Sequence, residues 1–299
     1  MNYLKSFALT GLMVSLFISC SKEEKLDSTS VFVDSKVEKN DLDKYIYTNF
    51  TIPYNLDIIY KYVDRESDLN YNLVPATYDA SVRLVKLINY LGLEPYNDLT
   101  GSKEFIRSNF PKVLNFIGSS PIQNNGNVIL GTAENGAKMT LYNLMNLNAS
   151  TATNASYLTE QYFKTIHHEF QHILNQRKPF PSDFRAITGT TYVDDAWATV
   201  YTSNGAAVAA GYVSRYASKA PEEDFAELFS IYVTRSQAAF DAALSVTGST
   251  AAGRTLVLQK LNIVKTYMKD KWNIDMDALR SNYLDRASKL STFDQTTIK

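Results

Sequence analysis

Positions 167 to 172 read His167-His168-Glu169-Phe170-Gln171-His172 and contain all three histidines of the 299-residue chain. From His168 to His172 the residues form the pattern H-E-x-x-H. On a helix, histidines four positions apart project from one face, where both imidazoles can bind one zinc ion. Glu169 would then lie beside the open metal position and could accept a proton from a zinc-bound water. The pattern therefore predicts a zinc centre in which Glu169 is the general base.

The residues around this motif favour a helix. Large apolar side chains recur at spacings of three and four positions: Tyr162, Phe163, Ile166, Phe170, Ile173 and Leu174. This spacing is typical of a helix with one buried face. The opposing interpretation is a helix with incidental histidines. We favour the metal site because the chain places its whole supply of histidine here.

Length and charge limit the class of protein. A chain of 299 residues can form one large domain or two lobes with an ample core. The net charge is −1, and the 30 basic and 31 acidic side chains are mixed along the sequence. This removes any electrostatic case for nucleic-acid binding. No internal repeat or linker demands a second independent domain.

The N-terminus has the features of a lipoprotein signal. A short basic start is followed by an apolar run over positions 7 to 18, too short to span a bilayer stably, and by Ser19-Cys20. These residues resemble a bacterial lipobox, which implies a signal peptide over residues 1–19 and a lipid on Cys20. Cys20 is the one cysteine, so no internal disulfide is possible. The alternative is an ordinary signal peptide with a coincidental cysteine.

Residues 20–40 are polar and charged, as expected for a solvated tether between the lipid and a domain. Lys22-Glu23-Glu24 resembles the lysine-plus-two-acids signal that sends some lipoproteins to the outer face of the outer membrane. We therefore expect an outer-membrane lipoprotein exposed at the cell surface. The domain would cover residues 41–299, with an N-terminal lobe over about 41–157 and a C-terminal lobe over about 158–299.

The N-terminal part is expected to combine helices with a small sheet. An amphipathic helix is predicted over Tyr78–Leu91 with Gly92 as its end. A second is predicted over Ser102–Ile117, kinked or broken at Pro111. An Asn-Gly pair before Met139 predicts a β-hairpin. The strand from Met139 to Leu144 is then either an edge strand that pairs with a substrate backbone or an ordinary strand of the sheet.

The C-terminal part is expected to be helical after a long loop. Residues 180–210 have few helix signals and are predicted to form a loop over the cleft. Pro221 followed by acidic residues marks the start of a helix. Two further helices are predicted over Thr255–Trp272 and Met276–Leu290.

A catalytic zinc needs a third protein ligand, and no other histidine is available. The ligand must therefore be a carboxylate or a tyrosine. Glu223 is our candidate, because it lies at the start of the helix that follows Pro221. Glu227, one turn later, could accept a hydrogen bond from the second nitrogen of a ligand histidine. The alternative for both acids is that they complement the helix dipole and are hydrated.

A competing third ligand comes from the segment between Gly189 and Asp195. It loosely resembles the glycine-threonine-aspartate signature of the aspzincins, which would make Asp194 or Asp195 the ligand. The aspartate is displaced and the Tyr-Gly that should follow is missing.

The motif and Glu223-Asp224-Phe225-Ala226-Glu227 together resemble the gluzincin metallopeptidases. In this segment the chain specifically resembles anthrax lethal factor, a protein of that family that has H-E-F-G-H followed by E-F-F-A-E. The resemblance implies that Glu223 binds zinc. It also implies that Tyr216, seven residues before Glu223, supports the oxyanion. Gln171 stands where glycine is usual, a departure that constrains packing and leaves the ligands unchanged.

From lipobox to terminal helices, the chain is similar to the zinc-binding metallopeptidase lipoproteins associated with substrate import. This resemblance implies a neighbouring importer of the TonB-dependent type and a substrate captured at the surface.

We therefore expect a mainly helical α+β protein with a zincin-like metallopeptidase fold: a small sheet, the H-E-x-x-H helix and a helical C-terminal lobe. One Zn²⁺ per chain would lie in the cleft, bound by His168, His172 and Glu223. The expected activity is hydrolysis of a peptide or protein substrate, with Glu169 as general base and Tyr216 as oxyanion donor. The alternative is a nutrient-binding surface lipoprotein of an import system with a structural or vestigial zinc site. An intact Glu169 argues for the enzyme, because a structural site does not need it.

Overall fold

The computed structural model describes residues 38–123, 128–134 and 136–298. Asn40–Lys299 forms one compact unit. The predicted signal peptide, Cys20 and the Lys22-Glu23-Glu24 trio lie outside the described residues. Over the described ranges, no helix combines the length and the apolar character that crossing a membrane requires.

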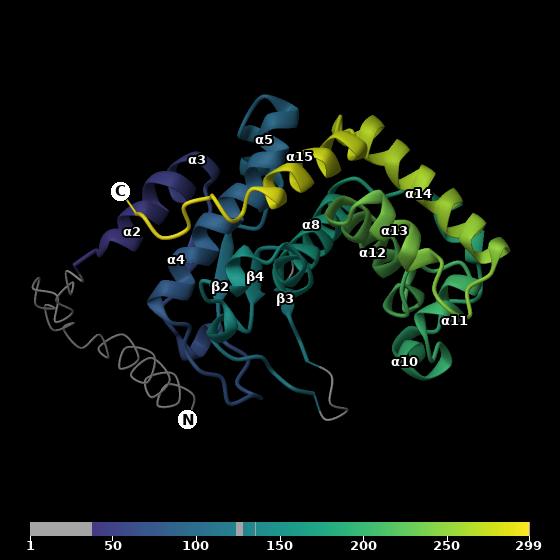
Figure 1. Ribbon diagram of the computed structural model, residues 1–299, viewed down its shortest axis with the longest axis horizontal. Coiled ribbons are helices and arrows are strands. Elements are labelled where there is room, and N and C mark those ends of the chain that lie inside the picture. The colour runs from purple at the N-terminus through teal and green to yellow at the C-terminus, as the bar shows by residue number, and fades with distance from the viewer. Residues whose placement is uncertain (1–37, 124–127, 135, 299) are drawn as a thin grey trace, which may run out of the picture. The chain divides into compact units, whose positions relative to one another are not determined.

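The compact unit is mainly helical and contains one four-stranded sheet (Figure 1). Its α-helices are α2 (Asp41–Ile46), α3 (Ile52–Tyr54), α4 (Tyr78–Leu87), α5 (Glu94–Thr100), α6 (Glu104–Asn109), α7 (Ala155–Leu158), α8 (Lys164–Arg177), α9 (Ser182–Thr188), α10 (Trp197–Val200), α11 (Asn204–Ala209), α12 (Pro221–Thr234), α13 (Gln237–Leu244), α14 (Ala251–Trp272) and α15 (Met276–Ser288). Three π-helical segments, η1 (Tyr47–Thr51), η3 (Ile88–Leu93) and η6 (Thr159–Phe163), join or extend them. The 3₁₀ turns are η2 (Asp64–Glu66), η4 (Leu144–Asn146), η5 (Thr151–Thr153), η7 (Asp194–Ala196) and η8 (Tyr216–Ser218). The expected mainly helical α+β architecture is confirmed.

The sheet has the strand order β1-β2-β4-β3, with β1 (Asp57–Ile59), β2 (Val113–Phe116), β3 (Gly131–Glu134) and β4 (Lys138–Leu141). The strands β1, β2 and β4 run parallel, and β3 is antiparallel to β4. The predicted hairpin is therefore present, and Gly136 in its turn has a φ of 71°. The edge-strand prediction for Met139–Leu144 is wrong, because β4 pairs on both sides. Within the described part of the chain, the strand at that edge is β3.

The predicted helix over Tyr78–Leu91 forms, but Gly92 does not end it. The α4 helix continues through η3 into α5, and a Cβ at Gly92 would make only ordinary contacts, at 3.7 Å or more. The helix predicted over Ser102–Ile117 is wrong in its second half. Phe110 is extended, with φ −74° and ψ 155°, as the residue before a proline tends to be. The chain therefore leaves α6 at Pro111 and enters β2.

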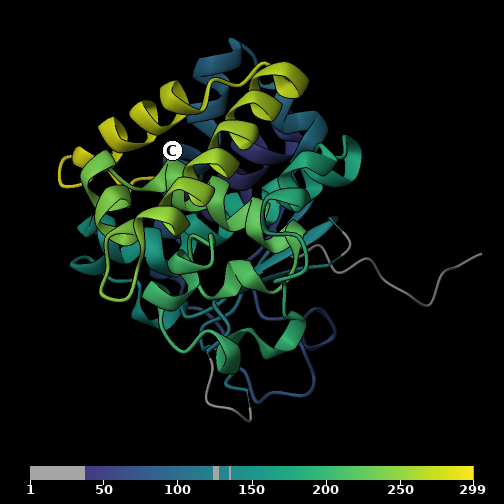
Figure 2. The same cartoon turned by 90° about the vertical axis from the view of Figure 1, so that its right-hand side faces the viewer.

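Residues 180–210 are more ordered than the predicted loop. They form the short elements α9, η7, α10 and α11, of which α11 is rich in alanine, the residue with the highest helix propensity. The predicted terminal helices are present as α14 and α15, and α13 lies before them. Figure 2 shows the yellow-green helices of this C-terminal part in front of the purple and blue elements of the N-terminal part.

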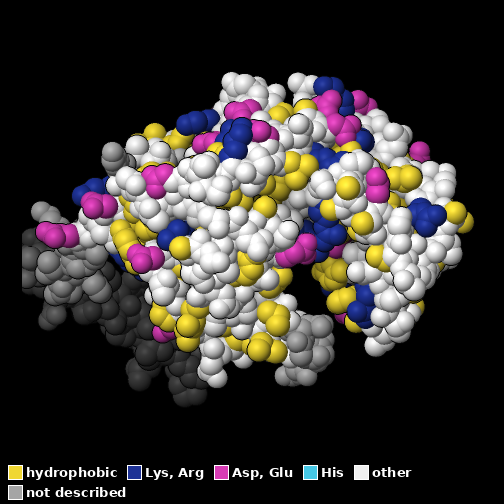
Figure 3. Space-filling model, in the orientation of Figure 1, with side chains coloured by type: hydrophobic (Ala, Val, Ile, Leu, Met, Phe, Trp, Pro, Cys, Tyr) yellow, Lys and Arg dark blue, Asp and Glu magenta, His cyan; other side chains and the backbone are white. Residues whose placement is uncertain are grey.

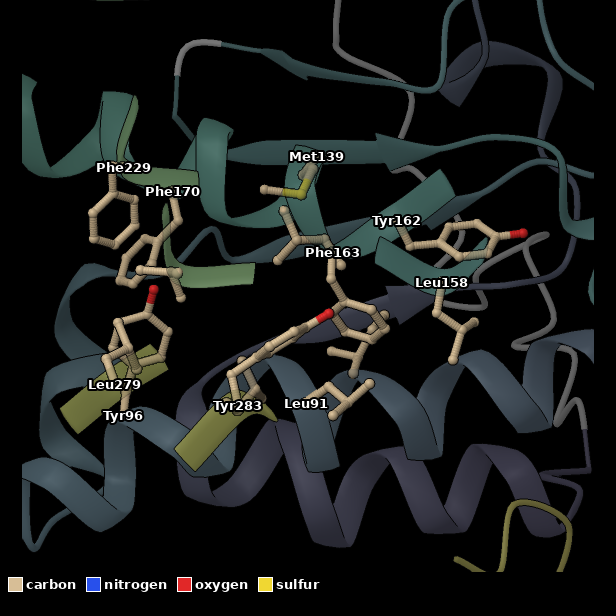
Figure 4. Close-up of a cluster of buried hydrophobic side chains, with 14 of the residues drawn as sticks. Leu91, Tyr96, Met139, Leu158, Tyr162, Phe163, Phe170, Phe229, Leu279 and Tyr283 are labelled. Atoms are coloured by element: carbon tan, nitrogen blue, oxygen red, sulfur yellow. The ribbon is translucent and has the colours of Figure 1, made fainter. Parts of the chain in front are cut away.

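The main core lies behind α8. Phe170 is fully buried there, and its ring makes edge contacts with Tyr96 at 5.3 Å and Phe110 at 5.1 Å between centroids. Figure 4 shows Phe170 of α8 near Tyr96, with Phe229 of α12 beside it. Aromatic pairs of this kind add roughly 0.5–1.5 kcal/mol each beyond area burial. One face of α8 is thus fixed by the core, and the face with His168 and His172 is left for the cleft.

Candidate metal centre

Two histidines and one glutamate converge at the cleft. His168 and His172 lie one turn apart on α8, with 3.0 Å between their Nε2 atoms. The Oε2 atom of Glu223 lies 3.0 Å from Nε2 of His168 and 3.2 Å from Nε2 of His172. Of the residues that the structure describes, these three form the one group of His, Cys, Asp or Glu side chains that could hold a metal ion.

The donor set fits zinc. Tetrahedral zinc with bonds of about 2.0–2.1 Å to nitrogen and oxygen places neighbouring ligand atoms about 3.3 Å apart. The three donor atoms here are separated by 3.0, 3.0 and 3.2 Å. Two imidazoles and one carboxylate leave a fourth position for water or substrate, as catalytic zinc sites do. The structure thus brings together the three residues that the sequence predicted as ligands.

Glu223 reaches the histidines because α12 begins at Pro221, just before Glu223, and packs against α8. Pro221 occupies the first turn, where its missing N–H leaves no bond unmade, and Glu222, Glu223 and Asp224 complement the positive end of the helix dipole. The α12 helix packs directly against α8. A ligand in the first turn of α12 therefore faces the histidines on α8.

Glu227 lies one turn after Glu223 and contacts the other side of His168. Its Oε1 atom is 3.2 Å from Nδ1 of His168, and its Oε2 atom accepts a hydrogen bond of 2.7 Å from the Ser214 hydroxyl. Lys164 lies 3.2 Å from the same carboxylate. A carboxylate in this place orients the imidazole and makes it a more basic ligand. Burial alone would raise the pKa of Glu227, but the charge of Lys164 and the contact with His168 lower it below its usual range.

The same carboxylates act on His168. Burial would lower its pKa, but contacts with Glu223 and Glu227 raise the pKa of His168 to about 9. The pocket is therefore strongly favourable to positive charge at this position. A divalent cation can supply that charge in place of the proton, because a metal ligand must be deprotonated.

Glu169 faces the same cavity, which has a volume of about 660 Å³ and is also lined by His168, His172 and Glu223. Burial raises the pKa of Glu169, and the charges of Glu223 and Glu227 add to this while the two histidines oppose it. A raised pKa is what a carboxylate needs to take up a proton near neutral pH. The position and the electrostatics both suit the predicted general base.

Tyr216 lies at the cleft, at the start of η8. Its ring is 6.0 Å from the ring of His168 and 5.3 Å from that of Trp197, between centroids. Burial, followed by the charge of Glu223, raises the pKa of Tyr216, so that the phenol keeps its proton. Tyr216 is therefore available as a hydrogen-bond donor in the cavity.

The start of β3 and the residue before it form another part of the cavity wall. Leu130, Gly131 and Thr132 line it. Gly131 lies so close to α8 that a Cβ there would be 2.6 Å from Cγ2 of Thr165. In the space-filling view a deep hollow separates the part that contains the sheet from the part that contains α10 and α11 (Figure 3).

His167 does not belong to the metal centre. It is buried in the core, where its Nδ1 atom lies 2.8 Å from the Tyr96 hydroxyl. Burial lowers the pKa of His167 to about 3, so the ring is neutral. Two of the three histidines therefore lie in the candidate metal centre, and the third packs in the core.

The alternative ligands lie elsewhere. Asp195 has a side chain that is 93% exposed and pairs with Lys219 at 3.3 Å. Neither Asp194 nor Asp195 is a member of the metal-holding group found among the described residues.

Several residues at the cavity were not predicted from the sequence. Lys164 and Trp197 are among those that line it, and Ser214 supports it through its hydrogen bond to Glu227. Lys164 precedes His168 by four positions, so helical spacing could have identified it. Ser214 and Trp197 come from segments with no recognisable motif, and only the folded chain brings them to the site.

A comparison with protein families matches residues 35–277 to a family described as "Putative zinc-binding metallo-peptidase". Among solved structures, the crystal structure of a putative zinc-binding metallo-peptidase from Bacteroides caccae is similar, with a TM-score of 0.76 and 36% sequence identity. The match covers 90% of this chain and 100% of that chain. None of the curated proteins matches this chain.

Proposed function

The chain belongs to the putative zinc-binding metallo-peptidase family, and on that premise we propose that it is a gluzincin-type peptidase with one zinc ion per chain. His168, His172 and Glu223 would hold the metal. The observation that carries the proposal is the convergence of their three donor atoms in a cavity that Glu169 also lines. A structural zinc site would have no use for Glu169 there.

The chemistry is hydrolysis of a peptide bond. Zinc, when bound, polarises the scissile carbonyl and lowers the pKa of a water toward roughly 7. Glu169 takes the proton of the attacking water and passes it to the leaving amine. Tyr216 donates a hydrogen bond to the developing oxyanion. Glu227 keeps the imidazole of His168 in orientation.

We propose that the substrate binds in extended form along β3. This strand has β4 as its partner on one side only within the described residues, and it lies against α8 at Gly131. A strand edge beside the catalytic groups can pair with a peptide backbone and place one of its carbonyls near the metal. The hairpin prediction was thus right about the element and wrong about which of its two strands is open.

Zinc analysis of the purified full chain tests the ligand set. Wild type should contain about one zinc per chain, and Glu223→Ala should lower the occupancy markedly. Glu222→Ala is the matched control, because Glu222 precedes Glu223 directly but pairs with Arg185 at 3.1 Å on the exposed surface. Equal occupancy in wild type and Glu223→Ala would exclude Glu223 as a ligand.

We further propose that the protein is an outer-membrane lipoprotein at the cell surface, anchored through lipid on Cys20 and working beside a TonB-dependent importer. The lipobox and the Lys22-Glu23-Glu24 trio support this. The substrate would be a peptide or protein captured outside the cell.

A further inference from the structure

A lysine is completely buried beside the metal centre. Lys260 of α14 has no exposed surface, and its ammonium group forms an ion pair with Asp224, which is 1% exposed. The ammonium also donates a hydrogen bond of 3.0 Å to the carbonyl oxygen of Gly211. The Tyr212 ring lies 4.3 Å from it, in the range of a cation–π contact. Tyr192 completes the arrangement by donating a 2.8 Å hydrogen bond to Asp224.

This ion pair touches two segments that supply the site. Asp224 follows Glu223 directly in the first turn of α12, but its side chain turns to α14 while Glu223 faces α8. Gly211 begins the segment that carries Ser214, the hydrogen-bond donor to Glu227. That segment has little room to move, because a Cβ at Gly211 would lie 3.0 Å from the side chains of Leu256 and Thr188.

The start of α12 lacks a helix cap, although Glu222 and Glu223 in its first turn also make polar contacts, with Arg185 and with the two histidines. Its N-cap residue is Ala220, and no side chain in the described structure caps that end of the helix. An uncapped end is less stable than one capped by Ser, Thr, Asp or Asn. The first turn of a helix frays most readily, and here it is the turn that carries the third ligand. The buried pair therefore acts where the helix is weakest.

Stability alone does not explain such a pair. Removing two charges from water is expensive, and apolar replacements of similar volume are often as stable or more stable. Removing one partner, in contrast, leaves an uncompensated buried charge and is strongly destabilising. A buried ion pair fixes the local geometry, because each charged group has a single low-energy position, next to its partner.

We propose that Lys260 and Asp224 position the metal centre: their ion pair holds the first turn of α12 and the segment after Gly211, so that Glu223 stays within bonding distance of the metal. Both are positioning residues. The inference rests on the proposed role of Glu223 as a ligand.

The test is a double variant, Lys260→Met with Asp224→Leu, which removes both charges and leaves neither uncompensated. Its fold is checked by circular dichroism and its affinity for Zn²⁺ by competition with a chromophoric chelator. We expect a folded protein whose zinc affinity is lower by about 10–100-fold, the range seen when supporting groups around a metal are removed. Cobalt(II) titration should show a weaker and altered visible spectrum, because the carboxylate ligand is no longer held in place.

The matched control is Lys265→Met with Asp277→Leu, a second pair that starts on α14. These side chains are 31% and 62% exposed, and their 2.7 Å contact joins α14 to α15, away from the first turn of α12. The control should keep the zinc affinity and the cobalt spectrum of wild type. If the first double variant also keeps both, the positioning role is excluded.

A milder variant covers the case in which the double variant does not fold. Tyr192→Phe removes one hydrogen bond to Asp224 and leaves both charges in place. It should weaken zinc binding several-fold, and an unchanged affinity would count against the proposal. Failure of the proposed function is a separate outcome, because wild type and Glu223→Ala would then bind zinc equally well.

Discussion

Glu169 and Glu223 are two carboxylates beside the same pair of imidazoles, and their surroundings shift their pKa values in opposite directions. Burial raises the pKa of Glu169. Burial would do the same for Glu223, but its contacts with His168 and His172 lower its pKa below the usual range. A carboxylate held in the charged form is suited to bind a cation, whereas one with a raised pKa is suited to exchange protons. This difference supports the proposed roles of Glu223 as ligand and Glu169 as base.

The first prediction concerns Glu169→Gln. The variant keeps the size of the side chain but cannot accept the proton of the water. It should retain wild-type zinc content and lose turnover by several orders of magnitude, measured on a cleaved peptide from a library screen. Glu160→Gln serves as a control, because Glu160 pairs with Arg235 outside the metal cluster and should leave turnover unchanged. Loss of zinc in Glu169→Gln would show that Glu169 is a ligand instead of the base.

For single residues, the sequence was informative where the chemistry requires a fixed spacing between side chains. His168 and His172 had to lie four positions apart, and Glu169 had to lie between them. Ser214 and Lys260 could not be found in this way. Each acts through a contact with α12 that depends on the path of the chain, and serine and lysine are common residues with no required neighbour.

At the scale of elements, close backbone packing sets the position of the segments around the site. Gly253, in the first turn of α14, lies against α11, and a Cβ there would be 2.0 Å from the carbonyl oxygen of Val208. The contact between α11 and α14 thus requires a residue without a side chain. Because α11 leads directly to Gly211, this contact also sets where the segment with Ser214 begins.

We predict that Gly253→Ala destabilises the protein by about 1–3 kcal/mol, as overpacking of a filled interior does. For a protein of this size each kcal/mol lowers the melting temperature by about 2–4 °C, which scanning calorimetry can resolve. Gly92→Ala is the control, because a Cβ there would meet nothing nearer than 3.7 Å. That variant should be neutral or slightly more stable, since alanine is favoured over glycine within helices by roughly 1 kcal/mol. Similar melting temperatures for the two variants would contradict the packing argument.

Elements with a clear period or start signal were predicted well, as α8, α12, α14 and α15 show. The errors have physical causes. Pro111 was interpreted as a kink or a break within one helix, although a proline can equally turn the chain into a strand, as it does before β2. The open edge of the hairpin was assigned to the wrong strand because β2, the second partner of β4, was taken for helix. Strand order depends on long-range pairing and leaves no local signal.

At the scale of the whole molecule, we expect the fold to form without the metal. The compact unit has an extensive buried core, unlike small zinc domains whose folding depends on the ion. We predict that chelator-treated protein keeps its far-UV circular dichroism and melts several degrees lower, since ligand at 100 times its Kd adds about 2.7 kcal/mol. Adding Zn²⁺ back should restore the melting temperature. A protein that unfolds on chelation would show that the centre is structural.

The anchor is tested by Cys20→Ala, which should not incorporate labelled palmitate in cells. Replacing Lys22, Glu23 and Glu24 by alanine should leave lipidation intact and protect the domain from protease added to whole cells. Serine substitutions of Lys36 and Lys39, in the same tether, serve as the control and should leave the domain accessible. An accessible triple variant would place the export signal elsewhere, and a protected wild type would place the enzyme on the periplasmic side.

The distance along the chain between the ligands has a consequence for how the protein matures. His168 and His172 lie 55 and 51 residues before Glu223, and α9, α10 and α11 fold in between. A chain that has emerged only as far as α8 presents the two imidazoles without Glu223, so we expect it to bind zinc weakly. With Glu223 as third ligand, tight binding must wait until α12 has docked on α8 and α14 has closed behind it. Tight zinc binding is then one of the last steps of folding. A chain that retains the ion is one in which α12 has docked on α8.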